Sequence, residues 1–310
     1  MLLGLAVGDA LGVPVEFKSR DILKKNPIKE MIGFGSHKVP AGTWSDDSSL
    51  SFCLAEALLD DFNVEELGKL FVRWYEDGYW TANGDVFDIG MTTHVAIIKM
   101  TTGIKAEMAG EINETSNGNG SLMRIAPLVF HVYSKSIHAR YTIIKQVSSI
   151  THAHIRSVVS CFYYVEFCRQ LLFGKSKSEA YLKMQEAIPS FLVNQGVPQN
   201  EIDQFDRLLK NDIAILKESE IKSSGYVVHT LEAAIWIFMT SDNFEECVLK
   251  AVNLGDDTDT TAAVTGALAG MYYGEKQIPL SWLNILSRRG DIESLGKSLN
   301  NVWMINKAAS

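Results

Sequence analysis

The chain has 310 residues, of which 46% are hydrophobic, and its 29 lysines and arginines against 37 aspartates and glutamates give a net charge of −8. This composition is typical of a globular protein with a sizeable core, while the charge argues against a nucleic-acid partner held through phosphate contacts. No stretch approaches the roughly 20 apolar residues that a membrane span requires, so no membrane association is expected.

The chain opens on a short apolar run, Met1–Gly12, which has no basic flank and is interrupted by Asp9. We therefore interpret it as a core helix rather than a signal peptide. Four cysteines lie in apolar stretches and form no CxxC pair: Cys53, Cys161, Cys168 and Cys247. Buried, reduced thiols in a cytoplasmic protein are expected.

Hydrophobic periodicity predicts helices along most of the chain. Proline is absent from 41–126, 128–188 and 199–278, and such spans suit helices because a helix interior tolerates proline poorly. The expected helices are, in chain order, 51–59, a helix after Asn63 with Glu66 completing a capping box, a buried helix over 155–172, and a helix around 231–238.

Three segments are expected to be connections between helices: 17–44, 75–93 and 190–203. Long ordered loops in a helical protein are more often functional than not. Alternating strand patterns are scarce, and no repeat of fixed period is present. The sequence thus predicts an all-α fold, a compact bundle of many orthogonally packed helices that forms a single domain over residues 1–310.

Two acidic clusters, Thr43–Ser49 and Gly255–Thr261, each lie directly before a helical run. Either cluster taken alone could be a helix N-cap, although a cap needs one such side chain and each cluster offers several. Asp256, Asp257 and Asp259 bring like charges together within one turn, which costs stability unless a cation offsets them. Because hard divalent ions take carboxylate and hydroxyl ligands, two such clusters in one chain favour metal binding.

Small residues follow the second cluster at helical spacing. Ala262, Gly266 and Gly270 fall at i, i+4 and i+8, so another backbone can approach this face of the helix closely. The stripe is first a packing feature, and it would also hold the acidic turn rigidly on a buried helix.

Several other polar residues have an ordinary interpretation when taken singly. The Ser116–Ser121 segment, with two glycines before an expected helix start, is most simply a turn, although its N–H groups could face an anion. Arg124 is expected in an internal ion pair and Asp88 at a helix N-cap. His152 and His154, two apart on a helix, would point their rings in different directions.

Taken together and in order, these segments resemble the ADP-ribosylglycohydrolase family, which includes dinitrogenase reductase-activating enzymes and ADP-ribosyl-arginine and ADP-ribosyl-serine hydrolases. The resemblance covers nearly the whole chain, and it rests on Gly4–Gly12 with Glu16, Thr43–Asp47, Phe87–Gly90, Gly118–Ser121 with Met123–Pro127, Thr151–His152, Ser224–Val227 and Gly255–Thr260.

The resemblance implies two Mg²⁺ ions, or Mn²⁺, at the bottom of a cleft. The positions that match the family's metal ligands are Ser45, Asp46 and Asp47 in the first cluster and Asp257, Asp259 and Thr260 in the second. Ser45 stands where the family usually has Thr, and Asp256 where Gly is frequent.

The resemblance also implies catalytic roles for Glu16 and Asp88. The positions that match the family's substrate-binding residues are Gly118, Asn119, Gly120, Ser121, His152 and Tyr226. The implied activity is metal-dependent hydrolysis of the glycosidic bond between ADP-ribose and an acceptor such as arginine, on an ADP-ribosylated protein or a small ADP-ribosyl substrate. A carboxylate would move a proton as an oxocarbenium-like C1 forms.

Two alternatives belong to other classes. A prenyl-diphosphate enzyme is also all-α and metal-dependent, but its chemistry expects Asp-Asp-x-x-Asp, whereas Asp46-Asp47 is followed by Ser-Ser-Leu. A catalytically inactive ADP-ribose-binding or structural family member is the second alternative, and the intact ligand positions argue against it. The motifs do not identify the acceptor, and the oligomeric state is open.

Overall fold

The computed structural model describes residues 1–309, and the side chains of residues 1–305. In this part of the chain the regular elements are helices, and two isolated β-bridges pair Glu111 with His152 and Gly118 with Tyr226. The α-helices are α1 Leu2–Gly12, α2 Arg20–Lys25, α3 Asp46–Ala57, α4 Val64–Asp77, α5 Met91–Thr101, α6 Ala106–Ala109, α7 Val129–Val132, α8 Ile137–Ser149, α9 Ile155–Leu172, α10 Lys177–Asn194, α11 Gln199–Ile202, α12 Asp206–Leu209, α13 Val227–Met239, α14 Phe244–Asn253, α15 Thr258–Tyr273, α16 Leu280–Ile285 and α17 Arg289–Ala309.

The all-α prediction is confirmed. The buried helix expected over 155–172 is α9, and the helix expected after Asn63 is α4, whose first N–H groups, those of Glu65 and Glu66, are capped by the Asn63 side chain. The capping box is wrong in one half, because the Glu66 carboxylate pairs with Lys69 instead. That the single domain spans all 310 residues stays a prediction.

The connection expected over 190–203 is also partly wrong. Helix α10 continues to Asn194 with Pro189 inside it, and α11 begins at Gln199. The apolar side chains of Ile188, Phe191 and Leu192 are buried, and this burial outweighs the helix-breaking tendency of the proline.

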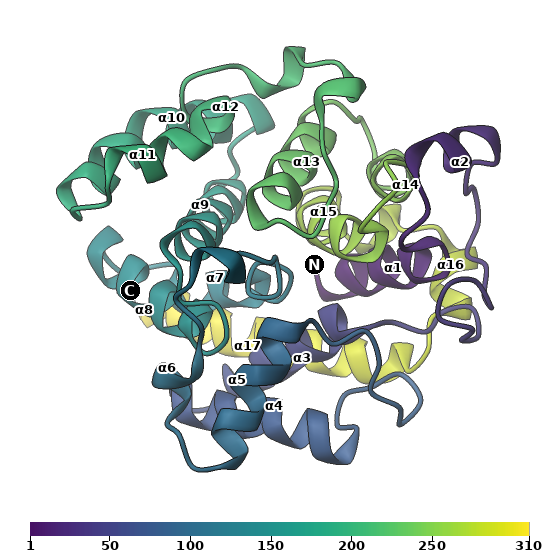
Figure 1. Ribbon diagram of the computed structural model, residues 1–310, viewed down its shortest axis with the longest axis horizontal. Coiled ribbons are helices and arrows are strands. Elements are labelled where there is room, and N and C mark those ends of the chain that lie inside the picture. The colour runs from purple at the N-terminus through teal and green to yellow at the C-terminus, as the bar shows by residue number, and fades with distance from the viewer. Residues whose placement is uncertain (310) are drawn as a thin grey trace.

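Helices α1 and α15 lie antiparallel against each other near the middle of the molecule (Figure 1), with α13 and α14 beside them and α3 and α17 on the other flank. The two central helices pack backbone against backbone. A Cβ atom at Gly8 would lie 2.0 Å from the Ala262 carbonyl oxygen, and one at Gly12 would lie 2.3 Å from Asp259 Cα. The small-residue stripe of α15 therefore does let another backbone approach closely, and that backbone is α1.

This contact determines where the two acidic clusters lie. Helix α3 begins at Asp46 and α15 at Thr258, so each cluster sits at a helix N-terminus. Because α1 packs against both helices, it brings the two N-termini to one place although 212 residues separate their first positions (258 − 46). No helix in the described residues is long and apolar enough to span a bilayer.

Candidate active site

Carboxylates from three helices converge where α1, α3 and α15 meet. Oxygens of Asp9, Asp47 and Asp259 all lie within 4.8 Å of one another. The Thr260 hydroxyl donates to Asp47 Oδ2 at 3.2 Å, and the Ser45 hydroxyl donates to the same oxygen at 3.0 Å. The two clusters therefore form one buried acidic centre.

Asp9 was not among the residues predicted for the site. Its carboxylate accepts hydrogen bonds from the backbone N–H groups of Ser45 at 2.9 Å and Ser48 at 3.0 Å. Two orphan N–H groups at the start of α3 are thereby satisfied by a side chain of α1. The signal in the sequence was the single acid inside an apolar first helix.

The oxygen atoms of this centre are only partly satisfied by the protein. Asp47 Oδ1, Asp257 Oδ1 and Asp259 Oδ2 are buried and have no hydrogen-bond partner among the described residues. Buried carboxylate oxygens without partners are costly unless something cationic compensates them. Several buried carboxylates beside threonine and serine hydroxyls are a donor set that fits hard divalent cations, so this cluster can hold metal ions.

Burial also opposes ionisation of these acids. Desolvation raises the pKa of Asp46, Asp47 and Asp259 well above the ordinary value, and neighbouring carboxylates raise it further. Asp257 is shifted in the same direction by burial, although the Asn119 side chain donates to its Oδ2 at 2.8 Å. A bound cation would oppose these shifts, because it stabilises the charged form of each carboxylate.

A second group of acids lies at the edge of the centre. The His37 imidazole contacts the Glu16 carboxylate, and its Nε2 lies 3.8 Å from Asp88 Oδ1. Burial raises the pKa of Glu16 to about 10, with the Asp88 carboxylate adding to the shift. Burial likewise raises the pKa of Asp88 to about 7. The group can therefore hold a proton near neutral pH.

Asp88 does not cap α5 as the sequence alone suggested, because the N-cap residue is Gly90. Asp88 instead adopts φ +62°, in the left-handed region. Such a conformation costs energy for a residue with a side chain, and it persists only where the surroundings enforce it. Its carboxylate lines the cleft and is not used in helix capping.

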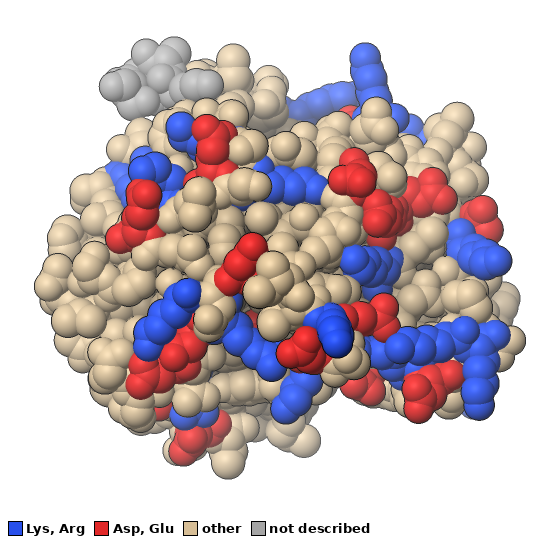
Figure 2. Space-filling view, turned by 90° about the horizontal axis from the view of Figure 1, so that it is seen from above, with Lys and Arg blue, Asp and Glu red and all other residues tan. Residues whose placement is uncertain are grey.

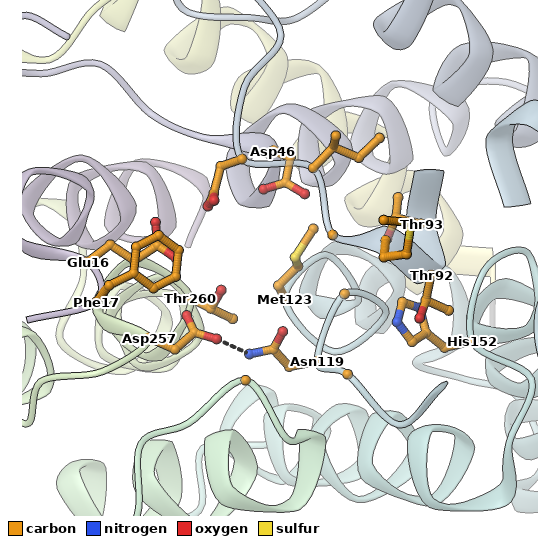
Figure 3. A pocket seen from close by; sticks show the side chains of 17 residues that line it. Glu16, Phe17, Asp46, Thr92, Thr93, Asn119, Met123, His152, Asp257 and Thr260 are labelled. Atoms are coloured by element: carbon orange, nitrogen blue, oxygen red, sulfur yellow. Dashed lines mark hydrogen bonds between the residues drawn. The ribbon is translucent and has the colours of Figure 1, made fainter. Parts of the chain in front are cut away.

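A cleft of about 380 Å³ opens above these groups. In Figure 3 the carboxylates of Glu16, Asp46 and Asp257 lie on one side of it, and His152 lies on the opposite side beyond Asn119 and Met123. The residues that line it are Glu16, Phe17, Asp46, Asp88, Ile89, Gly90, Met91, Thr92, Thr93, Gly118, Asn119, Gly120, Met123, His152, Gly225, Asp257 and Thr260.

Most of the predicted site residues lie in or directly beneath the cleft. Ser45, Asp47 and Asp259 are buried below its floor and do not line it. Two predicted substrate-binding residues are not brought to the lining. Ser121 is fully buried and its hydroxyl accepts from Ser148, while the Tyr226 ring packs edge-on against His229.

The glycine loop on the far wall is held by contacts across the fold. The Asn119 N–H donates to the Gly225 carbonyl at 3.0 Å, and its side-chain amide donates to Asp257 Oδ2 at 2.8 Å. A Cβ atom at Gly120 would lie 2.8 Å from His152 Cε1. Only glycine at this position lets the loop lie against the histidine ring.

A sequence model of the ADP-ribosylglycohydrolase family matches residues 1–308. The chain belongs to the ADP-ribosylglycohydrolase family. It is 35% identical over 303 residues to ADP-ribosylarginine hydrolase Tri1 of Serratia proteamaculans (strain 568), covering 96% of this chain and 77% of that protein. Its identity to the ADP-ribosyl-(dinitrogen reductase) glycohydrolase of Rhodospirillum rubrum is 28% over 295 residues, covering 94% of this chain and 90% of that protein.

Solved structures agree with this assignment. One described as an ADP-ribosylglycohydrolase-related protein complex superimposes with a TM-score of 0.80 at 32% identity, covering 97% of this chain and 96% of the other. The resemblance inferred from the motifs is thereby confirmed, and the chain is a glycosidic-bond hydrolase of this family. The prenyl-diphosphate alternative is wrong.

Two expectations for this glycohydrolase need correction. The fully buried Arg124 guanidinium donates to the carbonyl oxygens of Gly120 and Val147, in place of the acidic partner expected for it. Arg124 thus holds the glycine loop through the Gly120 carbonyl. His152 and His154 lie before α9 and not on a helix, and His154 is the α9 N-cap residue. The His152 ring nevertheless faces the cleft.

On the face seen in Figure 2, lysine and arginine side chains are interspersed with acidic ones and do not form an uninterrupted basic stripe.

Proposed function

We propose that this ADP-ribosylglycohydrolase cleaves the N-glycosidic bond between ADP-ribose and an arginine side chain, on an ADP-ribosylated protein or a small ADP-ribosyl substrate. The observation that carries the proposal is the cluster of buried carboxylates with unpartnered oxygens beneath a cleft lined by further acids. The 35% identity to a protein named ADP-ribosylarginine hydrolase supports arginine as the acceptor.

Two divalent cations, Mg²⁺ or Mn²⁺, would be held by the residues of the two clusters: Ser45, Asp46, Asp47, Asp257, Asp259 and Thr260. When bound, such ions supply Lewis-acid activation of water and orientation of the ribose hydroxyls. The unpartnered oxygens of Asp47, Asp257 and Asp259 support this assignment.

Residues of the chain itself would bind the ADP-ribose and transfer the proton. The Gly118–Gly120 loop and the His152 ring form the wall against which the ADP-ribose lies. Glu16 and Asp88 form the proton-exchanging pair. As water adds its oxygen to C1, the C1–N bond breaks, and one proton passes through this pair from the water toward the departing guanidine nitrogen.

The test is ADP-ribose release from an ADP-ribosyl-arginine peptide and an ADP-ribosyl-serine peptide, each with Mg²⁺, with Mn²⁺ and with EDTA. Metal-dependent release from the arginine peptide is expected. Asp46→Asn and Asp257→Asn should lower kcat by about 100-fold or more, since each removes a negatively charged ligand. Binding of ADP-ribose without release from either peptide would instead favour an inactive ADP-ribose-binding protein.

A further inference from the structure

A phenylalanine stands at the cleft where its conformation and its exposure are both unfavourable. Phe17 lines the cleft beside Glu16, the residue is 72% exposed, and its backbone has φ +64°. A left-handed conformation is rare for a bulky residue, and an exposed phenyl ring gains little from burial. Neither packing nor local backbone preference therefore explains this residue.

The backbone of Phe17 is nevertheless firmly held. Its N–H donates to the Asp256 carbonyl at 2.7 Å, and the Asp256 N–H donates to the Lys18 carbonyl at 2.8 Å. This pair of hydrogen bonds ties Phe17 to the loop of the second acidic cluster, so the point at which its side chain leaves the backbone is fixed relative to that cluster. In Figure 3 the ring lies directly beside Glu16 at the acidic side of the cleft.

Phe17 is the exposed member of an aromatic rim, which consists of Phe17, His37 and Phe87. The His37 ring centroid lies 6.0 Å from that of Phe17 and 5.2 Å from that of Phe87. His37 also contacts Glu16, so the rim and the proton-exchanging pair are joined. An occupant of this side of the cleft meets a π face and a carboxylate at once.

The charges at this side favour a cation. Among the described residues no lysine or arginine lines the cleft, and four acids do. Asp46 and Asp257 would face the metal ions, which leaves Glu16 and Asp88 to face the acceptor. A guanidinium is planar, stacks on aromatic faces and donates to carboxylates in its own plane. Serine, as an acceptor, offers neither the plane nor the charge.

We propose that Phe17 determines acceptor specificity, in that its phenyl face receives the guanidinium of the ADP-ribosylated arginine while Asp88 accepts from the edge of the same group. The proposal rests on the proposed arginine-directed function and adds the residue that selects the acceptor. It also explains why a strained, exposed aromatic side chain stands at this point in the cleft.

The experiment compares Phe17→Leu with Phe17→Tyr in the full-length, metal-loaded protein. Leucine keeps an apolar side chain but loses the π face, so KM for an ADP-ribosyl-arginine peptide should rise about tenfold with kcat nearly unchanged. Tyrosine should retain the wild-type KM. The Kd of free ADP-ribose, measured by calorimetry, should not change in either variant, because ADP-ribose lacks the acceptor.

Phe34→Leu is the matched control. Phe34 is also 74% exposed with φ +60°, but it does not line the cleft, and its replacement should leave KM unchanged. An unchanged KM in Phe17→Leu, or an equal weakening of ADP-ribose binding, would overturn the role of Phe17 alone. Failure of the wild-type protein to release ADP-ribose from arginine would overturn the proposed function, and the role of Phe17 with it.

Discussion

His37 lies outside the predicted set of site residues but contacts two acids within that set. It comes from the 17–44 segment, which was predicted only as a connection, and it contacts Glu16 while lying near Asp88. Burial lowers the pKa of His37, which favours the neutral ring, and one proton is shared between its Nε2 and the Glu16 carboxyl group. His37 is therefore a positioning residue for the proton-exchanging pair.

Replacement of His37 should reduce turnover more than ground-state binding. His37→Ala removes the hydrogen-bond partner that orients Glu16, and kcat for the arginine peptide should fall about tenfold, less than the roughly 100-fold or more expected on loss of a general acid–base group itself. His37→Gln should recover part of the loss, because its amide can donate to the same carboxylate. Steady-state kinetics of both variants check this, and equal loss in the two would contradict a positioning role.

Asp9 gives a prediction about stability. In Asp9→Ala the N–H groups of Ser45 and Ser48 would lose their acceptor while remaining buried, which should lower the free energy of unfolding by about 2–6 kcal/mol, at about 1–3 kcal/mol for each unsatisfied group. Asp9→Asn keeps an acceptor oxygen and should cost less. Urea unfolding in EDTA measures both, and a smaller loss for Ala than for Asn would contradict the capping role.

At the level of elements, the α1–α15 contact is the structural support of the acidic centre. Gly8 and Gly12 face Ala262 and Asp259 so closely that no side chain fits between the two backbones. The separation of these helices therefore fixes the separation of Asp9 from Asp259. A change in helix packing would be felt as a change in metal-site geometry.

Gly8→Ala should therefore destabilise the protein and disturb the site together. The new Cβ would lie 2.0 Å from the Ala262 carbonyl oxygen. Overpacking typically lowers the free energy of unfolding by about 1–3 kcal/mol, and a value of about 3 kcal/mol or more is expected here because a backbone atom must move. Metal-dependent stabilisation should shrink as well. Thermal unfolding with Mg²⁺ and with EDTA measures both effects.

Gly290→Ala is the control for this substitution. Gly290 lies in α17, where a Cβ would meet nothing within 4 Å, so alanine should leave stability unchanged or raise it by up to about 1 kcal/mol through helix propensity. If Gly8→Ala behaved like Gly290→Ala, the close packing of α1 on α15 would not be required.

For the whole molecule, the acidic centre links stability to pH and to metal. Burial raises the pKa of Asp9 and Asp88 from 3.8 to about 6 and about 7. An acid whose pKa is raised on folding binds more protons in the folded state than in the unfolded state. Its contribution to stability is therefore present below the unfolded pKa and is lost as the pH rises through the folded pKa.

Metal binding should reverse this loss. Because the cation competes with protons for the carboxylates, the stabilisation by Mg²⁺ or Mn²⁺ relative to EDTA should increase between about pH 5 and pH 8. At a hundred times the dissociation constant it should reach about 3 kcal/mol. His131 and His152, whose pKa values burial lowers to about 4 and about 3, contribute to the pH dependence of stability with the opposite sign. Their contributions cancel when the stability measured in EDTA is subtracted from that measured with metal at each pH. A pH-independent difference would contradict metal binding at these acids.

The sequence by itself determined the class of fold and the main chemistry. Helical periodicity is a local property, so α4 and α9 were predictable from their own residues. The two acidic clusters were recognisable because each carries more acids than a helix cap needs. The small-residue stripe of α15 indicated a close helix contact, although not which helix makes it.

Only the tertiary structure decided which residues meet. Asp9 joined the centre through the packing of α1, His37 reached Glu16 from a loop, and Ser121 and Tyr226 fell outside the cleft lining although their motifs lie beside it. Pro189 remained inside a helix because burial of neighbouring side chains outweighed a local preference. The physical reason is common to these cases: local pattern specifies an element, whereas side-chain contacts across the chain depend on how the elements pack.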